Sequence, residues 1–475
     1  MRRGVLVIIA VSTALLSFPT RAERLLEPFH EDLVVPEAEP ESAPADEDDI
    51  LGPWSPNVAP VPADPTVAPL FADSGSPQPT TDARRTVLGT LVCLVAVAVL
   101  AYLGGHRKVR EIEGRLGLSQ MITSGFPFVI MGVIARLPSV GIVSDAVLTE
   151  LGPALRFALA WIGFVIGVRF DTRLFADVPA SAARAVLAVT VLPFACVVAA
   201  CGALLFGIEN VGHELVNNPV FLRDAILLGT AAAMTAPDGP DAEPARRRLV
   251  RLEELAGIAG LMVVAAYFRP TVNATWQLPG TAWLFLTLGM GFVLGAVVYA
   301  LLLRTSGALD FPVLVLGSIA FAGGAAAYLS LSPVVVAFVA GVMVANLPGS
   351  LKEQLQPTLR RFERPIYLLF LFVVGAIWNV ADWRSWALAV LFAAMRLTGK
   401  YLAARLTWRR ENLELRRALA LAPMGPIAIA IAVSGQLLYR GGAIALVASA
   451  VVGGALLTEI ILQAGRRLFV RVGAM

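Results

Sequence analysis

The sequence is poor in charge, and this shortage restricts the classes of protein it can encode. Of its 475 residues only 15% are charged, whereas 57% are hydrophobic. A soluble chain of this length needs a larger share of charged residues to cover its surface. The formal net charge of only +3 also gives no reason to expect nucleic acid as a partner. The composition therefore points to a chain that lies mostly within a membrane.

Residues that usually build metal and catalytic sites are also scarce. The three cysteines all lie inside apolar runs: Cys93, Cys196 and Cys201. The three histidines all lie in tails or connections: His30, His106 and His213. No CxxC pair, Cys/His ligand spacing, HExxH or GxSxG occurs. We therefore expect no enzyme, no cofactor and no metal site.

The N-terminal part of the chain divides into two segments before the first long apolar run. Residues 1–22 have the pattern of a secretory signal peptide, with Arg2 and Arg3 ahead of an apolar core and a small-residue cleavage site. An uncleaved anchor helix is the alternative. Residues 23–84 contain PEAEPESAPADEDD and many further prolines, a composition typical of a disordered, solvated periplasmic tail.

From residue 85 onward, apolar runs of bilayer-spanning length follow one another to the C-terminus. About 20 apolar residues suffice for a membrane helix. The runs predict an all-α polytopic membrane domain over 85–475 with about 13 transmembrane helices, at roughly 85–105, 118–137, 153–170, 184–207, 220–236, 248–268, 281–303, 309–329, 332–347, 365–380, 385–407, 417–437 and 441–463.

The distribution of Lys and Arg predicts the orientation of these spans, because basic connections stay in the cytoplasm. If the first span begins outside, every strongly basic connection falls on the cytoplasmic side: around 107–115, 169–173, 246–248, 352–364, 409–417 and 466–471. The connections around 145–150 and 209–214 carry acids and fall outside. We therefore predict an inner-membrane protein with its N-terminus outside and its C-terminus cytoplasmic.

Two stretches of the sequence resemble each other. SGFPFVIMGVIARLP and LTELGPALRFALAWIGFVIGVRFD match LSPVVVAFVAGVMVANLP and LKEQLQPTLRRFERPIYLLFLFVVGAIWN, which aligns Pro138 with Pro348 and Gly167 with Gly375. The copies begin at the second and ninth spans. Because this offset is odd, they cross the membrane in opposite directions, which predicts an inverted-topology repeat, typical of secondary transporters.

Helix breakers occur at corresponding places in the two copies. The fifth span ends in TAPDGP, and the twelfth contains APMGP. Proline removes a backbone donor and glycine loosens a helix, so both spans are predicted to be discontinuous. Such breaks expose carbonyls that bind ions where they line a cavity. The predicted break residues are Pro237, Gly239, Pro423, Gly425 and Pro426.

Ionisable residues inside the spans are the candidates for a site, because charge is costly in the bilayer centre. Glu253 and Glu254 are adjacent in the sixth span, where two carboxylates in a low dielectric suit proton exchange. We expect Glu254 to be the more important of the two. The alternative is a first helical turn paired with Arg247 or Arg251 near the surface.

Two basic residues lie four apart in the eleventh span. Arg396 is near its middle, and Lys400 follows one turn later on the same face. They are expected to compensate charge at the helix breaks, although Lys400 also has the alternative of reaching the cytoplasmic surface. Glu459 in the thirteenth span lies closer to that surface and is the weaker candidate.

From about residue 114 onward the chain resembles the monovalent cation/proton antiporter family, in its Kef-like and sodium/proton exchanger branches. The resemblance rests on the order of several segments: RLPSVGIVSDAVLTELGPALRFALAWIGFVIGVRFD, AILLGTAAAMTAPDG, VVVAFVAGVMVANLP, RLTGKYLAARL and ALALAPMGPIAIAIAV. It implies crossed discontinuous helices and a homodimer in the lipid bilayer. It also implies that Glu253 and Glu254, with Thr235 and Asp238 at the first break, bind a monovalent cation and protons. Glutamate stands where the family has aspartate or asparagine.

Two other functions fit the same architecture. A sodium-coupled symporter for organic anions shares the inverted repeat, but it favours polar breaks over deep ionisable groups. A non-transporting membrane sensor that uses the acidic tail is the other. A flux measurement separates both from a cation/proton exchanger.

Overall fold

The structure, a computed structural model, describes residues 125–137, 143–170, 180–209, 219–236, 244–268, 270, 278–304, 310–348, 351–407, 423–441 and 443–472. All of them belong to the second of two units into which the chain divides, 1–75 and 76–475. The predicted signal peptide, acidic tail and first span lie outside the described residues, and so do Pro237, Asp238 and Gly239.

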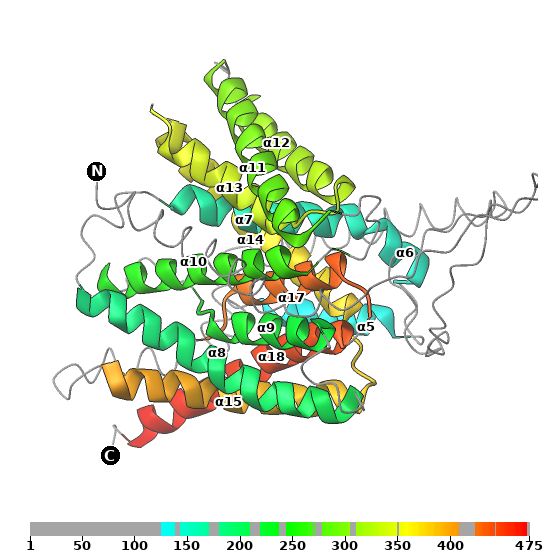
Figure 1. The fold of residues 1–475 in the computed structure, drawn as a ribbon, viewed down its shortest axis with the longest axis vertical. Coiled ribbons are helices and arrows are strands. Elements are labelled where there is room, and N and C mark those ends of the chain that lie inside the picture. Colours follow the sequence, from blue (N-terminus) through cyan, green and yellow to red (C-terminus); the bar gives the residue numbers. More distant parts are fainter. Residues whose placement is uncertain are drawn as a thin grey trace, which may run out of the picture. The chain divides into compact units, whose positions relative to one another are not determined.

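Every regular element in these ranges is an α-helix, which confirms the all-α prediction (Figure 1). The helices are α5 (Phe126–Arg136), α6 (Asp145–Glu150), α7 (Gly152–Arg169), α8 (Ala180–Glu209), α9 (Pro219–Ala233), α10 (Pro244–Tyr267), α11 (Gly280–Leu303), α12 (Asp310–Tyr328), α13 (Pro333–Asn346), α14 (Leu351–Ile377), α15 (Trp383–Thr407), α17 (Pro426–Leu438) and α18 (Ile444–Val472).

Each predicted span from 118–137 onward coincides with one of these helices. Within the described residues, six helical stretches are long and apolar enough to cross a membrane, and α5, α13 and α17 are shorter apolar helices. The largest difference from prediction is α14, which begins at Leu351 rather than near residue 365. Its added turns form because Leu351, Leu355 and Leu359 recur at helical spacing and are all buried. Helices of this length and composition are those of a multi-pass membrane protein.

The helices pack in two groups. The core group consists of α8, α9, α10, α15, α17 and α18, in which α8 packs along α15 and α9, and α15 packs along α18. The flanking group consists of α5, α7, α11, α12, α13 and α14, in which α7 lies against α13 and α5 against α14. The groups meet mainly where α10 touches α11 and where α17 touches α7 and α13.

Glycines bring backbones of the flanking group into direct contact. A methyl group added to any of four glycines would collide with a carbonyl oxygen of the facing helix. Only glycine permits this separation, so these crossings are fixed by sequence. The glycines and the residues whose carbonyls they face are Gly132 with Phe372, Gly375 with Val129, Gly167 with Phe338, and Gly341 with Phe164.

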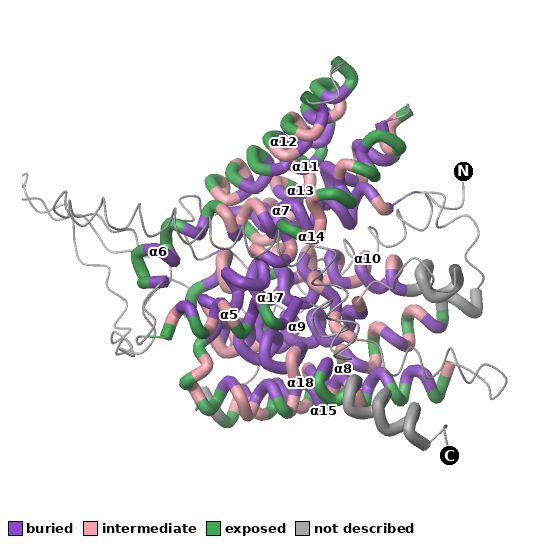
Figure 2. Tube along the Cα trace, turned by 180° about the vertical axis from the view of Figure 1, so that it is seen from behind, coloured by how far each residue is buried: buried purple, intermediate pink, exposed green. Residues whose placement is uncertain are grey.

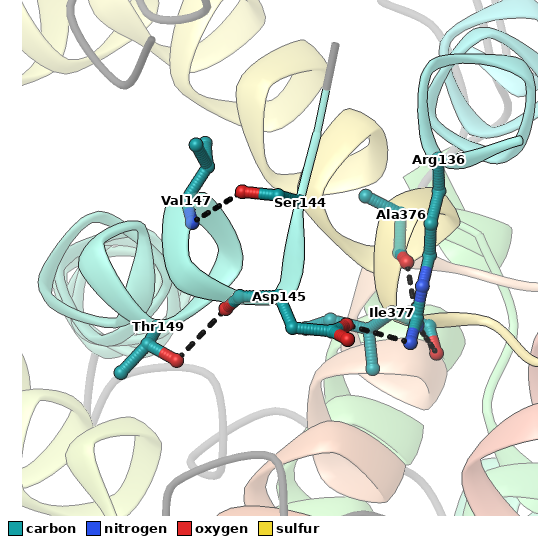
Figure 3. Close-up of polar contacts among 7 residues, drawn as sticks. All are labelled: Arg136, Ser144, Asp145, Val147, Thr149, Ala376 and Ile377. Carbon is teal, nitrogen blue, oxygen red and sulfur yellow. Dashed lines mark hydrogen bonds and ion pairs between the residues drawn. The ribbon is translucent and has the colours of Figure 1, made fainter. Parts of the chain in front are cut away.

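Arg136 closes one end of the α5–α14 contact (Figure 3). Its Nη1 donates to the carbonyl oxygens of Ala376 and Ile377, at 3.0 and 3.3 Å, which satisfies acceptors that the end of α14 leaves open. Its Nη2 lies 3.3 Å from the Asp145 carboxylate in the first turn of α6. Ser144 caps α6 by accepting from the Val147 amide.

Burial is concentrated where the two groups meet. Figure 2 shows buried residues gathered along α7, α9 and α17, and exposed residues along the outer faces of α12 and α15. Large apolar side chains such as Phe285, Phe292 and Phe321 are exposed on α11 and α12. Apolar exposure of this extent suits a surface in contact with lipid rather than with water.

Candidate ion-binding site

The ends of two helices meet within the core group. Helix α9 ends at Ala233, and Met234, Thr235 and Ala236 continue in a non-helical conformation. The non-helical residues 423–425 precede α17, which begins with Pro426 at its first position. The Ala236 amide donates to the Pro423 carbonyl over 2.9 Å, so the two breaks are bonded to each other. The described residues of the two predicted interruptions, 234–236 and 423–425, are non-helical and lie beside one another.

Glycine at position 425 makes this close approach possible. A methyl group there would lie 2.8 Å from the Thr235 carbonyl oxygen, which is too close for a carbon–oxygen contact. The proline at position 426 has no amide hydrogen, and its fixed φ suits a first helical position. Of the five predicted break residues, Pro423, Gly425 and Pro426 thus lie at this meeting point, which we call the crossing.

Lys400 points into the crossing from α15. Its Nζ donates to the Ala233 carbonyl at 2.7 Å, to the Thr235 hydroxyl at 2.9 Å and to the Glu253 carboxylate at 3.2 Å. An ammonium group has three hydrogens, so all of its donors are used. The residue is only 1% exposed, so Lys400 does not reach for the surface as the alternative interpretation required.

The direction of Lys400 follows from the way α15 packs against α8. A methyl group on Gly399 would overlap the backbone of Pro193, which lies inside α8. The two helices are therefore in direct contact at this turn. The neighbouring residue, Lys400, lies toward α9 and the crossing.

Arg396 binds the backbone of both breaks. Its Nη2 donates to the Met234 carbonyl at 2.9 Å and to the Pro423 carbonyl at 3.4 Å. The side chain is fully buried. Carbonyls at a helix end carry partial negative charge and attract cations, so one guanidinium stabilises the α9 end and the approach to α17 together.

Glu253 is the carboxylate of the crossing. It is 0% exposed, and its Oε2 forms the ion pair with Lys400. Its Oε1 is buried without a hydrogen-bond partner, which is unusual for a buried carboxylate oxygen. Helix α10 comes close to α9 because Gly257, one turn after Glu253, leaves room for the Met234 side chain. The crossing thus holds one carboxylate oxygen available to a ligand.

Glu254 faces a different environment. It is buried, and the charges that act on it include those of Arg169, Arg251 and Glu363. Arg169 and Glu363 form an ion pair that joins the end of α7 to α14. Adjacent helical residues point about 100° apart, so the two glutamates are divided between two faces of α10. This geometry favours Glu253, rather than Glu254, as the carboxylate of the site.

The charges of the crossing are unequal in the described residues. Lys400 and Arg396 bring two positive charges, and Glu253 brings one negative charge. No group of three or more His, Cys, Asp or Glu able to hold a metal ion occurs in the described part of the chain. The crossing offers oxygens from a carboxylate, a hydroxyl and backbone carbonyls, a combination that binds alkali cations and protons.

Sequence reasoning missed a buried ion pair near the start of α9. Arg223 and Asp224 are adjacent in the fifth span, and their side chains are 3% and 1% exposed. Two opposite charges inside an otherwise apolar run were a visible signal. Glu459 is buried in α18, where its charge acts on Tyr367 of α14.

Comparison with known proteins agrees with this architecture. Residues 251–465 match the family model described as sodium/hydrogen exchanger, transmembrane. A structure of the sodium proton antiporter MjNhaP1 from Methanocaldococcus jannaschii at pH 8 superposes with a TM-score of 0.54 and 14% identity, and covers 80% of this chain and 96% of that one. An electron-microscopy structure of MjNhaP1 gives a TM-score of 0.52 and 16% identity, with 79% and 96% covered. No curated protein sequence matches this chain. At these identities the two structures show a shared fold.

Proposed function

Because residues 251–465 belong to the sodium/hydrogen exchanger family, we propose that this chain exchanges a monovalent cation, Na⁺ or K⁺, for protons across the inner membrane. One observation carries the proposal. The Lys400 ammonium lies among a carbonyl, a hydroxyl and a carboxylate oxygen at the crossing of two broken helices. Oxygens of these kinds coordinate Na⁺ in such places, so a bound cation takes the place of the ammonium.

The charges of the crossing suggest how the exchange is coupled. Arg396 keeps its proton, because arginine does not deprotonate in proteins. With Glu253 ionised, the site carries a single positive charge when Lys400 is protonated. It carries the same charge when Lys400 has released its proton and a cation is bound. The cycle then exchanges one cation for one proton and moves no net charge.

We also propose that the chain is an inverted repeat, in which α5 and α7 correspond to α13 and α14. The glycine contacts support this pairing. Gly132 of α5 faces the Phe372 carbonyl of α14, and Gly341 of α13 faces the Phe164 carbonyl of α7. The two glycines are 209 residues apart and the two phenylalanines 208 apart, so the two contacts, each of which joins one copy to the other, lie at corresponding positions of the repeat.

The rest of the proposal concerns the setting of the exchanger. Residues 1–22 are proposed as a signal peptide, 23–84 as a periplasmic tail and 85–475 as the exchanger domain. The basic connections support an external N-terminus and a cytoplasmic C-terminus. The resemblance supports a homodimer. Asp238 beside the first break remains a proposed contributor to ion or proton binding, whereas Glu254, the other carboxylate expected from the sequence, is assigned to the border with the flanking group.

The direct test is cation-dependent proton flux in proteoliposomes, screened with Li⁺, Na⁺, K⁺ and Rb⁺. We expect flux with at least one of these cations, and a rate that does not rise with an imposed membrane potential. A potential-dependent rate would mean that Glu253 also takes up a proton during the cycle. Absence of flux with every cation would contradict the proposed function.

One observation favours a second candidate function. Two buried positive charges beside the amino end of α17 are also suited to an anion. A sodium-coupled organic-anion symporter would show Na⁺-dependent uptake of a radiolabelled carboxylate into the same vesicles. The exchanger is preferred because both positive side chains already have oxygen partners. Arg396 binds backbone carbonyls, and Lys400 is paired with Glu253.

A further inference from the structure

The proposed exchange mechanism leaves the ion pair of Arg223 and Asp224 without a role. Both residues are buried within α9, at 2% and 1% exposure. Asp224 precedes Thr235 by 11 residues, which corresponds to about 16 Å along a helix axis. The pair therefore lies toward the opposite end of α9 from the crossing. By the predicted topology, that end is the outer one.

Arg223 joins α9 to the segment that follows α17. Its Nε donates to the Asp224 Oδ1 at 2.7 Å, and its Nη2 donates to the Gly441 carbonyl at 2.8 Å. Its guanidinium lies 4.9 Å from the centre of the Tyr439 ring. The arginine thus ties the outer ends of α9 and α17 together, as Arg396 ties their inner breaks.

Asp224 is only half satisfied in this arrangement. Its Oδ1 receives the bond from Arg223, whereas its Oδ2 is buried without a hydrogen-bond partner. Buried polar atoms in proteins nearly always have a partner. The joint between α9 and α17 consists of Arg223, Gly441, Tyr439 and the Ala443 backbone, which also bonds the Asp224 carboxylate, and none of these contacts gives Oδ2 a partner.

The surroundings of Oδ2 suit a proton better than a metal cation. The guanidinium beside Asp224 repels any metal ion. Within the described ranges no group of three or more His, Cys, Asp or Glu that could hold a metal ion is found. The Asp224 carboxylate faces Arg223 and the Ala443 backbone amide, and Tyr439 at the end of α17 lies against the Arg223 guanidinium. Two other helices packed against α9 carry charged groups, but these lie at its other end. Lys400 on α15 binds the last carbonyl of α9 at the crossing, and Glu253 on α10 pairs with Lys400 there.

We propose that Asp224 is a second proton-binding group of the exchanger, which binds a proton on Oδ2 and makes transport depend on the pH of the outer compartment. The proposal rests on the proposed function. A proton on Asp224 removes the counter-charge of Arg223, which then has only the Gly441 carbonyl and the Tyr439 ring. Protonation therefore changes the charge at the joint between α9 and α17, the two helices that form the crossing.

The test is Asp224→Asn, which keeps the size of the side chain but cannot ionise. Cation-driven proton flux is measured in right-side-out vesicles while the external pH is varied at fixed internal pH, and then the reverse. Proton competition through Lys400 acts on both sides, so we expect the wild type to depend more steeply on external than on internal pH. The variant should lose this difference and keep the dependence on internal pH. Asp145→Asn is the matched control, since Asp145 is also paired with an arginine on the predicted outer side but is 84% exposed (Figure 3).

A second variant covers the case in which Asn alone destabilises the protein. In Arg223→Gln/Asp224→Asn both charges are removed, and we expect the same loss of the difference between the external-pH and internal-pH profiles. If both variants slow transport equally at every external pH, with profiles of unchanged shape, the pair is a structural joint and the proposal is wrong.

An infrared measurement on the purified protein separates this inference from the proposed function. We expect the wild type to show a protonated-carboxyl band that appears as the pH is lowered, is lost in Asp224→Asn and is retained in Asp145→Asn. This result holds even if no cation drives flux, in which case only the proposed function fails. A wild-type spectrum without a band assignable to Asp224 overturns the inference.

Discussion

The two faces of α10 place the same residue type in two different environments. Glu253 lies at the crossing, bonded to Lys400 and closed off from solvent, with one oxygen open. Glu254, the next residue, is influenced by Arg169 and Glu363 of the flanking group. Two identical carboxylates, one residue apart, thus have different partners. One pairs with a lysine inside the core group, and the other lies at the border with the flanking group. An acidic pair in a membrane helix is assigned a role by the helices around it rather than by its own sequence.

The largest effect should come from Glu253→Gln. Lys400 would lose its counter-ion in a buried site, which typically costs about 3–5 kcal/mol in the free energy of unfolding. We expect cation-dependent proton flux to be abolished, because neither the ammonium nor a cation retains a charged ligand. Flux and thermal unfolding of the purified variant are the measurements. Glu253→Asp serves as the control and should keep part of the activity. Wild-type flux in the Gln variant would instead mean that Glu253 is not the carboxylate of the site.

An intermediate effect is expected for Arg396→Ala. The variant loses the bonds to the Met234 and Pro423 carbonyls, and hydrogen bonds to charged groups contribute about 1.5–3 kcal/mol each. We expect a lower unfolding temperature with part of the flux retained, since Arg396 binds backbone and not the carboxylate. Arg396→Lys should recover part of the stability. Complete loss of flux at normal stability would instead make Arg396 part of the exchange reaction.

The smallest effect is expected for Glu254→Gln, with a change in stability within about 1 kcal/mol. Proton flux should continue at a rate close to that of the wild type, because Glu254 does not contact Lys400 or the breaks. A double-mutant cycle with Glu363→Gln would measure how strongly the border charges interact. If Glu254→Gln abolishes flux as completely as Glu253→Gln, the two faces of α10 act as one site.

Much of the fold could be predicted from local sequence. Apolar runs locate the helices because membrane length and composition are local properties, and proline and glycine locate the breaks for the same reason. The choice between Glu253 and Glu254 could not be predicted, because it depends on the fit of Gly257 against Met234 of another helix. The direction of Lys400 depends likewise on contact between Gly399 and Pro193. The Arg223–Asp224 pair was visible in the sequence, but its link to Gly441 was not.

The bonding of Lys400 has a consequence for how cation affinity should be understood. The ammonium is a ligand tethered to the protein, so it competes with the dissolved cation at a high effective concentration that dilution does not lower. Its competitive strength is set by proton activity alone, since only the protonated amine occupies the three oxygens. The apparent dissociation constant for the cation is therefore not a fixed property of the site. In the proposed exchange it rises as protons accumulate, so transport slows when the compartment that the site faces becomes acidic, and a proton on Asp224 acts in addition to this competition.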